Sequence, residues 1–253
     1  MLYLALMFFI TAVLYAAVGF GGGSTYNALL VLADVDYRTL PSVALICNLI
    51  VVTGGTIQFA RAGHLHARTI VPFAALSVPM AWVGGRLPVD KSTFVLLLGL
   101  SLLFAGITML VESRRKRSRL RHFDPSTLWA VGLPVGAVLG LLAGIVGIGG
   151  GIFLAPILHF LRVADAKVIA ATSSAFIMVN SAAGLLGQTA KLGGLEQLQT
   201  LTGYGWLFLA VLVGGQIGSH LGSTKLSSAT VRVMTAILVL YVAARLLYSW
   251  IRI

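Results

Sequence analysis

Two glycine-rich segments interrupt the apolar sequence, GFGGGST at residues 19–25 and GIGGG at residues 147–151. Glycine lets backbone N–H groups converge on a ligand because it has no Cβ to obstruct the approach. A helix that begins just after such a segment points unpaired N–H groups and its positive dipole end at the gap, which suits an anion. The glycines expected to bind substrate are Gly21, Gly22, Gly23, Gly149, Gly150 and Gly151. The alternative is that they only permit close packing of helices.

Uncharged polar residues inside the apolar runs are further candidates, because hydroxyl and amide groups can donate hydrogen bonds to an oxyanion. The candidates of this kind are Ser24, Thr25, Asn48, Gln58, Thr172, Ser173, Asn180 and Gln188. Arg86 follows two glycines at an expected helix end and is a candidate cation facing the substrate pathway. The alternative for the polar residues is an interhelical hydrogen bond, and for Arg86 a side chain that reaches the membrane interface.

The carboxylates argue against a cation site. All seven fall at expected loops or helix ends: Asp34, Asp36, Asp90, Glu112, Asp124, Asp165 and Glu196. Cation carriers commonly place Asp or Glu within the membrane, since a cation needs a counter-charge at low dielectric. His64, His66 and His159 form no ligand set with a nearby acid, so neither a metal nor a cofactor is expected. The motifs of zinc proteases, serine hydrolases and P-loop enzymes are absent, so catalysis is not expected.

Composition predicts the solvent that surrounds these residues. The 253 residues are 58% hydrophobic and 10% charged, with a mean hydropathy of +0.97, whereas soluble domains carry roughly 25% charged residues. Only helices and closed barrels cross lipid, and the alternation typical of barrel strands is missing. The sequence therefore predicts an all-α polytopic membrane protein whose partner is the lipid bilayer.

Apolar runs between charges and prolines predict about eight membrane helices. They cover residues 2–18, 42–60, 70–85 and 93–111, and then residues 128–146, 168–188, 203–222 and 230–250. Each glycine-rich segment is followed by a short apolar piece, at residues 26–33 and 152–161. Because about 20 apolar residues are needed to cross a bilayer, neither piece can cross alone. We expect each to be a broken or re-entrant element.

The two halves of the chain also resemble each other in sequence. The first glycine triplet matches the second at an offset of 128 residues, and Gly54, Gln58 and Val83-Gly84-Gly85 match Gly184, Gln188 and Val213-Gly214-Gly215 at an offset of 130. Repetition of several landmarks in one order indicates an internal repeat. The expected organisation is a first membrane repeat at 1–111, a basic cytoplasmic linker at 112–125 and a second membrane repeat at 126–253.

The linker carries the strongest charge signal. Six of the 18 basic residues lie between positions 114 and 121. Beside a membrane helix such a cluster marks a cytoplasmic loop, so nucleic acid is not an expected partner. Four crossings per half then place both termini in the cytoplasm and make the repeats parallel. If the glycine elements dip in and return, the repeats are inverted, and the sequence leaves both arrangements open.

The second glycine segment continues as GIGGGIFLAP at residues 147–156, followed by AATS at residues 170–173. These motifs resemble the sulfite exporter TauE/SafE family, and the resemblance extends over the whole chain. It implies two repeats, about eight membrane helices, and movement of sulfite, sulfonates or other organosulfur anions. The first copy departs from the pattern, with Ser24-Thr25-Tyr26-Asn27-Ala28 where the second reaches Pro156.

Three functions follow as hypotheses. The leading one is a secondary transporter of the inner membrane that binds a small anion between the glycine elements and works by alternating access. The second is a membrane scaffold subunit whose glycines serve packing, and the third, disfavoured by the missing carboxylates, is a carrier for a metal cation. Substrate, direction, coupling ion and oligomeric state, a homo-oligomer included, are left open by the sequence.

Overall fold

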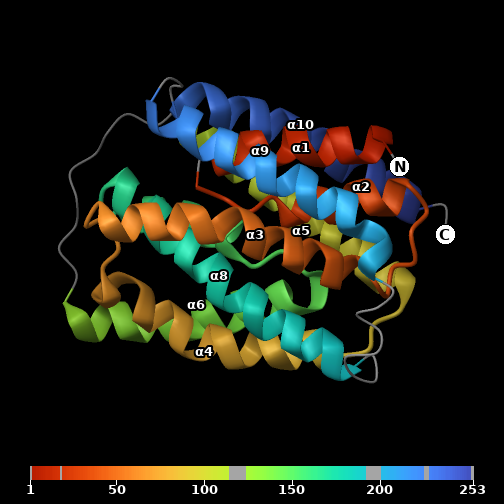
Figure 1. Ribbon diagram of the computed structural model, residues 1–253. Helices are drawn as coiled ribbons and strands as arrows, with labels where there is room; N and C mark the ends of the chain where they lie inside the picture. The colour runs from red at the N-terminus through yellow and green to blue at the C-terminus, as the bar shows by residue number, and fades with distance from the viewer. Residues whose placement is uncertain (1, 18, 114–123, 192–200, 225–227, 252–253) are drawn as a thin grey trace.

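The computed structural model describes residues 2–17, 19–113, 124–191, 201–224 and 228–251, and within these ranges all regular structure is helical (Figure 1). This agrees with the predicted all-α class. The helices are α1 (Leu2–Ala16), α2 (Gly23–Leu32), α3 (Leu40–Arg61), α4 (Ala67–Arg86), α5 (Lys91–Ser113), α6 (Pro125–Val146), α7 (Gly151–Leu161), α8 (Ala166–Lys191), α9 (Gly205–Thr224) and α10 (Ser228–Trp250). The two short apolar pieces expected after the glycine segments are α2 and α7.

Six segments among the described residues are long and apolar enough to cross a membrane. They are α3, α4, α6, α8, most of α5, and residues 201–221, which hold most of α9. By length and composition these segments suit the apolar interior of a bilayer. The chain is a multi-pass membrane protein.

The closest helix pair, α4 and α6, is held together by a stripe of small residues. Gly132, Gly136, Gly140 and Gly144 recur every four residues on α6 and so lie on one face. A Cβ at Gly132 would lie 2.8 Å from the Pro72 Cβ, and Gly144 faces Ala81 further along the same helix, so α4 and α6 run parallel. Small residues at this spacing let two backbones approach closely within a membrane.

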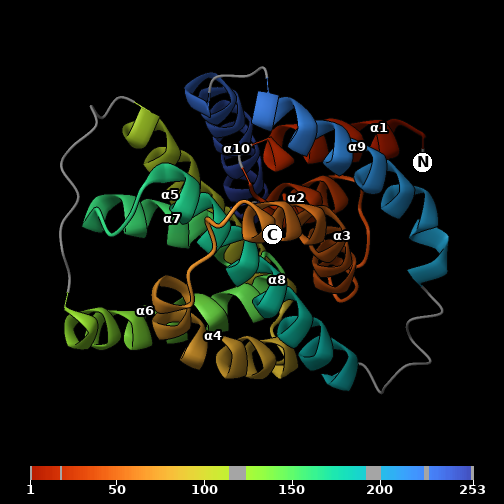
Figure 2. The same ribbon diagram turned by 60° about the vertical axis from the view of Figure 1, so that its left-hand side comes forward.

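A second parallel pair is built in the same way from α1 and α9. A Cβ at Gly214 would lie 2.6 Å from the Phe9 carbonyl oxygen, and Gly218 faces Val13 one turn later. Figures 1 and 2 show the two helices side by side along the bundle.

Two other long contacts, α3 with α8 and α5 with α10, join antiparallel helices. Along α3 and α8, Gly184 faces Leu45, while Thr56 and Ser174 share a hydrogen bond of 2.9 Å. Along α5 and α10, Gly99 faces Leu247 and Gly106 faces Leu240. The Trp250 indole also donates to Ser92 Oγ at 2.9 Å, close to the start of α5.

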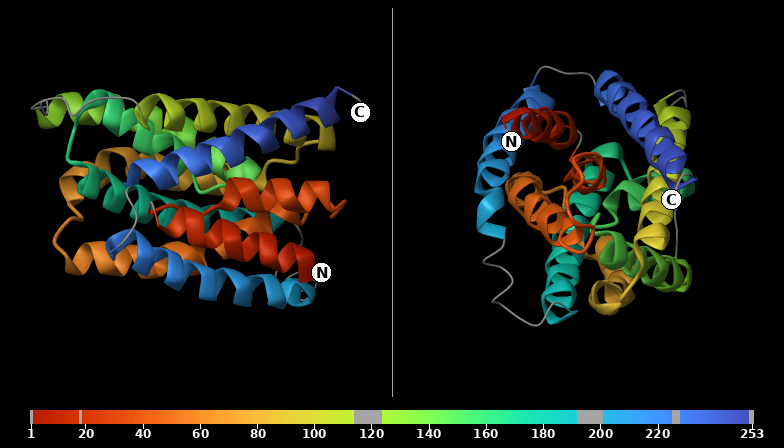
Figure 3. Two further views of the ribbon diagram at one scale, coloured as in Figure 1. Left: turned by 90° about the horizontal axis from the view of Figure 1, so that it is seen from above. Right: turned by 90° about the vertical axis from the view of Figure 1, so that its right-hand side faces the viewer.

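The chain termini and the flanks of the basic linker lie at opposite ends of the bundle. The start of α1 and the end of α10 lie at one end, and the end of α5 and the start of α6, which flank the basic linker, lie at the other (Figures 1 and 3). The linker itself lies outside the described residues. The flanks of the linker are therefore not at the same end of the bundle as the start of α1 and the end of α10, although the sequence analysis expected both the linker and the termini in the cytoplasm.

Candidate functional site

The residue just before each short helix has a backbone conformation that only glycine adopts readily. Gly22 precedes α2 with φ +88° and Gly150 precedes α7 with φ +76°. This left-handed conformation is unfavourable for residues with a Cβ. It turns an extended segment directly into the first turn of a helix, so each membrane element is broken into a loop and a short helix.

The two segments approach the same point from opposite ends of the bundle. Gly19 lies near Phe59, close to the end of α3, whereas a Cβ at Gly147 would lie 2.5 Å from the Cα of Pro41, at the start of α3. Between these ends, the side chain of Asn48 lies against Gly21, and a Cβ at Gly149 would lie 3.2 Å from Asn48 Nδ2. The two breaks therefore meet beside the middle of α3.

Asn48 joins the two breaks through the two ends of its amide. Its Oδ1 accepts a hydrogen bond from Gly23 N, the first N–H of α2, at 2.8 Å. Its Nδ2 is buried and has no hydrogen-bond partner. The side chain is 0% exposed, so a donor is held out of water beside the second break.

Helix α8 brings a further unpaired hydroxyl, that of Ser181, to the start of α7. A Cβ at Gly149 would lie 2.8 Å from Ser181 Oγ, and one at Gly151 would lie 2.8 Å from the Ser173 carbonyl oxygen. The hydroxyls of Ser181, Ser173 and Thr172 are buried without a hydrogen-bond partner. Among the described residues no side chain caps α7. The Asn48 amide, the Ser181 hydroxyl and the positive end of α7 thus lie at one break, an arrangement that suits a small oxyanion.

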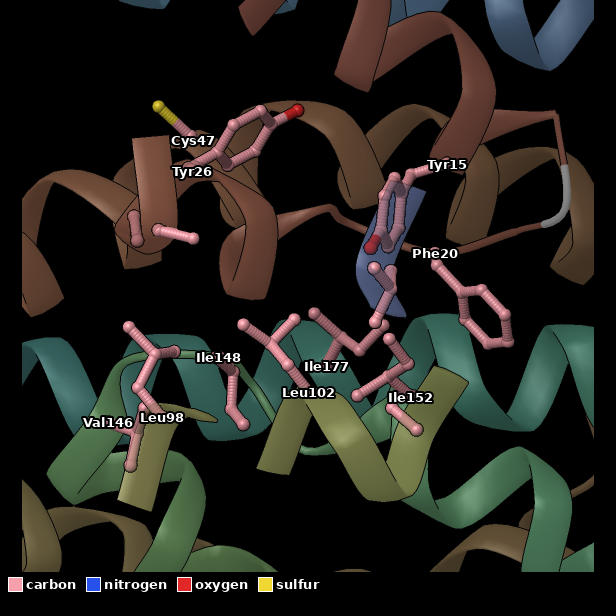
Figure 4. Close-up of a cluster of buried hydrophobic side chains, with 14 of the residues drawn as sticks. Tyr15, Phe20, Tyr26, Cys47, Leu98, Leu102, Val146, Ile148, Ile152 and Ile177 are labelled. Carbon is pink, nitrogen blue, oxygen red and sulfur yellow. The ribbon is translucent and has the colours of Figure 1, made fainter. Parts of the chain in front are cut away.

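Apolar side chains close the space around this point. Figure 4 shows Ile148 and Ile152 near Leu98 and Leu102 of α5, with Phe20 of the other break nearby. Phe20, Ile148 and Ile152 are each no more than 8% exposed. Buried apolar side chains therefore surround the breaks.

Two side chains hold the breaks in place. The Asn27 amide on α2 donates to the Val146 carbonyl at 2.6 Å and to the Gly147 carbonyl at 3.3 Å, satisfying carbonyls at the end of α6. Thr25 Oγ1 and the Tyr15 hydroxyl share a hydrogen bond of 2.8 Å between α2 and α1. Each contact fixes a short helix to a long one, and the first joins the two halves of the chain.

Three further predicted residues, Ser24, Asn180 and Gln188, are buried. Ser24 is buried in the first turn of α2. Asn180 Oδ1 accepts from Ser77 Oγ at 2.8 Å and its Nδ2 donates to the Phe176 carbonyl. Gln188 Nε2 donates to the Gly144 carbonyl at 2.9 Å, while its Oε1 is unpaired. Asn180 and Gln188 thus bind neighbouring helices.

Gln58 and Arg86 are not brought to the meeting point of the breaks. Gln58 is exposed near the end of α3, and Arg86 is exposed in the last turn of α4. The Arg86 guanidinium lies 4.6 Å from the centre of the Trp82 ring, as expected of a side chain at an interface. Since α3 and α8 run antiparallel, Gln58 and Gln188 lie towards opposite ends of the bundle.

Four buried polar residues were missed by sequence reasoning: Tyr26, Asn27, Ser42 and Ser181. Each holds an unpaired oxygen. A signal was present for Ser181, because Ser174, Ser181 and Gln188 are spaced by seven residues, which places them on one face of a helix. No such spacing pointed to Tyr26, whose ring lies against Gly22, one helical turn earlier at the N-cap of α2.

A bundle of apolar helices that contains two broken elements with polar groups at the breaks belongs to the class of polytopic membrane transporters. Comparison with known families agrees and is more specific. Residues 4–246 match the model of the sulfite exporter TauE/SafE family, so the chain belongs to that family.

Two curated relatives carry similar descriptions. A probable membrane transporter protein of Sinorhizobium fredii is 34% identical over 245 residues, covering 97% of each chain. A probable membrane transporter protein of Xylella fastidiosa is 29% identical over 147 residues, covering 55% of this chain and 56% of the relative. No solved structure matches the chain.

Proposed function

We propose that this protein is a secondary carrier for a small oxyanion, namely sulfite, a sulfonate or another organosulfur anion, which binds where the two breaks meet. One observation carries the proposal: Asn48 caps α2 through its Oδ1 and offers an unpaired, buried Nδ2 to the second break. The anion takes hydrogen bonds from Asn48 Nδ2, from Ser181 and from the first N–H groups of α7. The family supports the organosulfur class, and the site supports the charge.

The lengths of the short helices support a site at the middle of the membrane. At 1.5 Å per residue, the 10 residues of α2 and the 11 residues of α7 each span about 15 Å. This is half of a hydrocarbon core of about 30 Å. A helix that ends at the membrane surface therefore begins near the midplane, which is where carriers hold their substrates.

The helix pairing supports inverted repeats. If the halves correspond as the sequence suggests, α3 matches α8 and α5 matches α10, and both matched pairs run antiparallel. A two-fold axis along the membrane normal would make matched helices parallel, whereas an axis in the membrane plane makes them antiparallel. Gly84 and Gly214 also correspond, and they pack against α6 and α1, which correspond in turn. Alternating access then arises by exchange of conformation between two inverted halves.

Transport is tested with purified protein in liposomes under an imposed proton gradient. Labelled sulfite, sulfate and methanesulfonate are offered in turn, with empty liposomes alongside. The expected result is saturable uptake of an organosulfur anion. If none of the anions is taken up by correctly inserted protein, the carrier proposal fails and the scaffold alternative gains.

Asn48→Asp tests the site itself. Aspartate keeps an oxygen that accepts from Gly23 N, so the start of α2 remains capped, but it replaces the Nδ2 donor with a negative charge. Because an anion beside a buried carboxylate is repelled, uptake should fall at least about tenfold. Wild-type uptake by an Asn48→Asp protein that inserts and elutes normally would contradict the assignment of Asn48.

A further inference from the structure

A pocket separate from the meeting point of the breaks lies at the end of the bundle where α4 connects to α5. Its volume is about 320 Å³, which is within the range of small-molecule sites. Its walls include Tyr37, Arg38, Pro41, Phe94, Ile145 and Lys191. They come from the start of α3, the start of α5 and the ends of α6 and α8, so four helices far apart in the sequence build it.

The charge of the pocket has one sign. Arg38 and Lys191 contribute two cations, and no carboxylate belongs to the described lining. The acid next to Arg38 in the sequence, Asp36, accepts a hydrogen bond from the Arg38 backbone N at 3.1 Å. The Arg38 guanidinium lies 5.8 Å from the centre of the Tyr37 ring. The two cations therefore favour an anionic ligand.

The rest of the lining is apolar. Pro41, Phe94 and Ile145 face the space together with the ring of Tyr37, and Phe94 itself is 1% exposed. A bare inorganic anion would leave these walls without a partner, whereas an apolar tail would cover them and gain free energy by leaving water. Cations at one part of a pocket and hydrocarbon around it suit an organic anion.

We propose that this pocket binds a small organic anion with one sulfonate or carboxylate group and a short apolar tail. It adjoins the second break, since Ile145 lies in the last turn of α6 and Pro41 packs on Gly147. Ile145 is two residues before the second glycine segment, and Gly149 of that segment lies near Asn48. Binding at the pocket does not require that the anion then passes to the centre.

The same chemistry could reach the pocket from two sources. One is a free organic anion from the aqueous side, and the other is an acidic lipid whose headgroup meets the cations. The shared chemistry is an anionic group joined to hydrocarbon, and the source is decided by competition.

The test is binding of butanesulfonate to purified protein in a neutral detergent, measured by calorimetry. Butanesulfonate should bind at least about tenfold more tightly than methanesulfonate, because its longer tail buries more apolar surface. The double variant Arg38→Gln, Lys191→Gln should weaken butanesulfonate binding at least about tenfold. Lys91→Gln is the matched control, since Lys91 is exposed at the same end of the bundle and does not line the pocket.

Repeating the measurement in Asn48→Asp protein separates the pocket from the central site. Retained binding in that variant, lost on adding Arg38→Gln and Lys191→Gln, supports the pocket even if transport is never observed. Lys191→Arg keeps the charge and should keep the affinity, which excludes simple misfolding as the cause. Displacement of butanesulfonate by phosphatidylglycerol in nanodiscs, but not by phosphatidylcholine, assigns the site to lipid, and no displacement assigns it to the soluble anion. Butanesulfonate binding that is unchanged in the double variant overturns the proposal.

Discussion

Asn48 illustrates how one residue can organise a site within a membrane. A buried donor without a partner costs about 1–3 kcal/mol, and the unpaired Nδ2 of Asn48 lies beside the unpaired hydroxyl of Ser181 at Gly149. A carrier must release its substrate, so the donors at its site lose their ligand in every transport cycle. Their cost lowers the stability of the empty site and strengthens the binding of a ligand that satisfies them.

Ser181→Ala should weaken transport without unfolding the protein. The substitution removes a hydroxyl that has no partner in the described structure, so no existing hydrogen bond is lost. A hydrogen bond to a charged group contributes about 1.5–3 kcal/mol, so the substrate concentration for half-maximal uptake should rise at least about tenfold. The measurement is uptake into liposomes over a range of anion concentrations. Ser101→Ala, which changes a serine of α5 that is 8% exposed, is the control and should leave that concentration unchanged.

At the scale of elements, the stripe of glycines on α6 determines how closely α4 can approach. A Cβ at Gly140 would lie 2.6 Å from the Ser77 Cα, closer than real Cβ contacts. The neighbour is backbone, which cannot move away as a side chain can. A single added methyl group at a glycine such as Gly140 would therefore disturb the packing of α4 on α6.

Gly140→Ala should lower the stability of the protein in detergent. Overpacking of a closely packed contact typically costs about 1–3 kcal/mol, and this exceeds the gain of up to about 1 kcal/mol from replacing glycine with alanine in a helix. The measurement is thermal unfolding of the purified protein. Gly203→Ala introduces the same methyl group where no atom of another described residue, apart from its chain neighbours, lies within 4 Å. An equal loss of stability in both variants would contradict the packing argument.

Asp90 immediately precedes α5, and its hydrogen bonds make the stability of the protein depend on pH. The Thr93 hydroxyl donates to Asp90 Oδ1 at 2.6 Å and the Thr93 N–H donates to Oδ2 at 2.9 Å. These hydrogen bonds lower the pKa of Asp90 below its ordinary value of 3.8. A carboxylate whose pKa is lower in the folded state stabilises that state above pH 3.8 and loses this contribution as the pH falls through the folded-state pKa.

Asp90→Ala should therefore be less stable than the wild-type protein at about pH 7, with a smaller difference at about pH 3. Thermal unfolding in detergent at the two pH values measures the difference. A gap between the proteins that is as large in acid as at neutral pH would show that the carboxylate charge plays no part.

At the scale of the whole molecule, one end of the bundle holds the flanks of the linker, within which six Lys and Arg residues lie in the sequence. Arg61 ends α3 and Arg68 lies in the first turn of α4, at the end that also holds the flanks of the basic linker. The opposite end holds the start of α1 and the end of α10 (Figure 3). Lys and Arg gather on the cytoplasmic side of membrane proteins, so we expect the linker end to face the cytoplasm and both termini to face away from it.

Cysteine labelling in intact cells tests this orientation. In a Cys47→Ala background, Tyr3→Cys and Ile251→Cys should react with a membrane-impermeant maleimide, because both positions are 74% exposed and lie near the termini. His64→Cys, between α3 and α4, should react only after the membrane is permeabilised. The reverse pattern would place the termini in the cytoplasm and the basic end outside.

The sequence by itself determined the helical membrane class, the approximate bounds of the helices and the family. Each depends on local composition or on short motifs: apolar runs need lipid, and glycine triplets such as 21–23 and 149–151 interrupt helices wherever they occur. The choice of glycines and Asn48 as candidates also needed only residue types, because few polar groups occur within apolar runs.

Only the tertiary structure decided which of these residues meet. Asn48 and Gly149 are about a hundred residues apart in the chain, and their contact depends on α3 lying between two breaks that arrive from opposite ends. The same antiparallel arrangement separates Gln58 from Gln188 and leaves Arg86 exposed at an interface. The physical reason is that the direction and pairing of helices depend on packing across the bundle, as in the contact of α4 with α6. The pattern of residue types along one helix does not specify which other helix it packs against or in which direction.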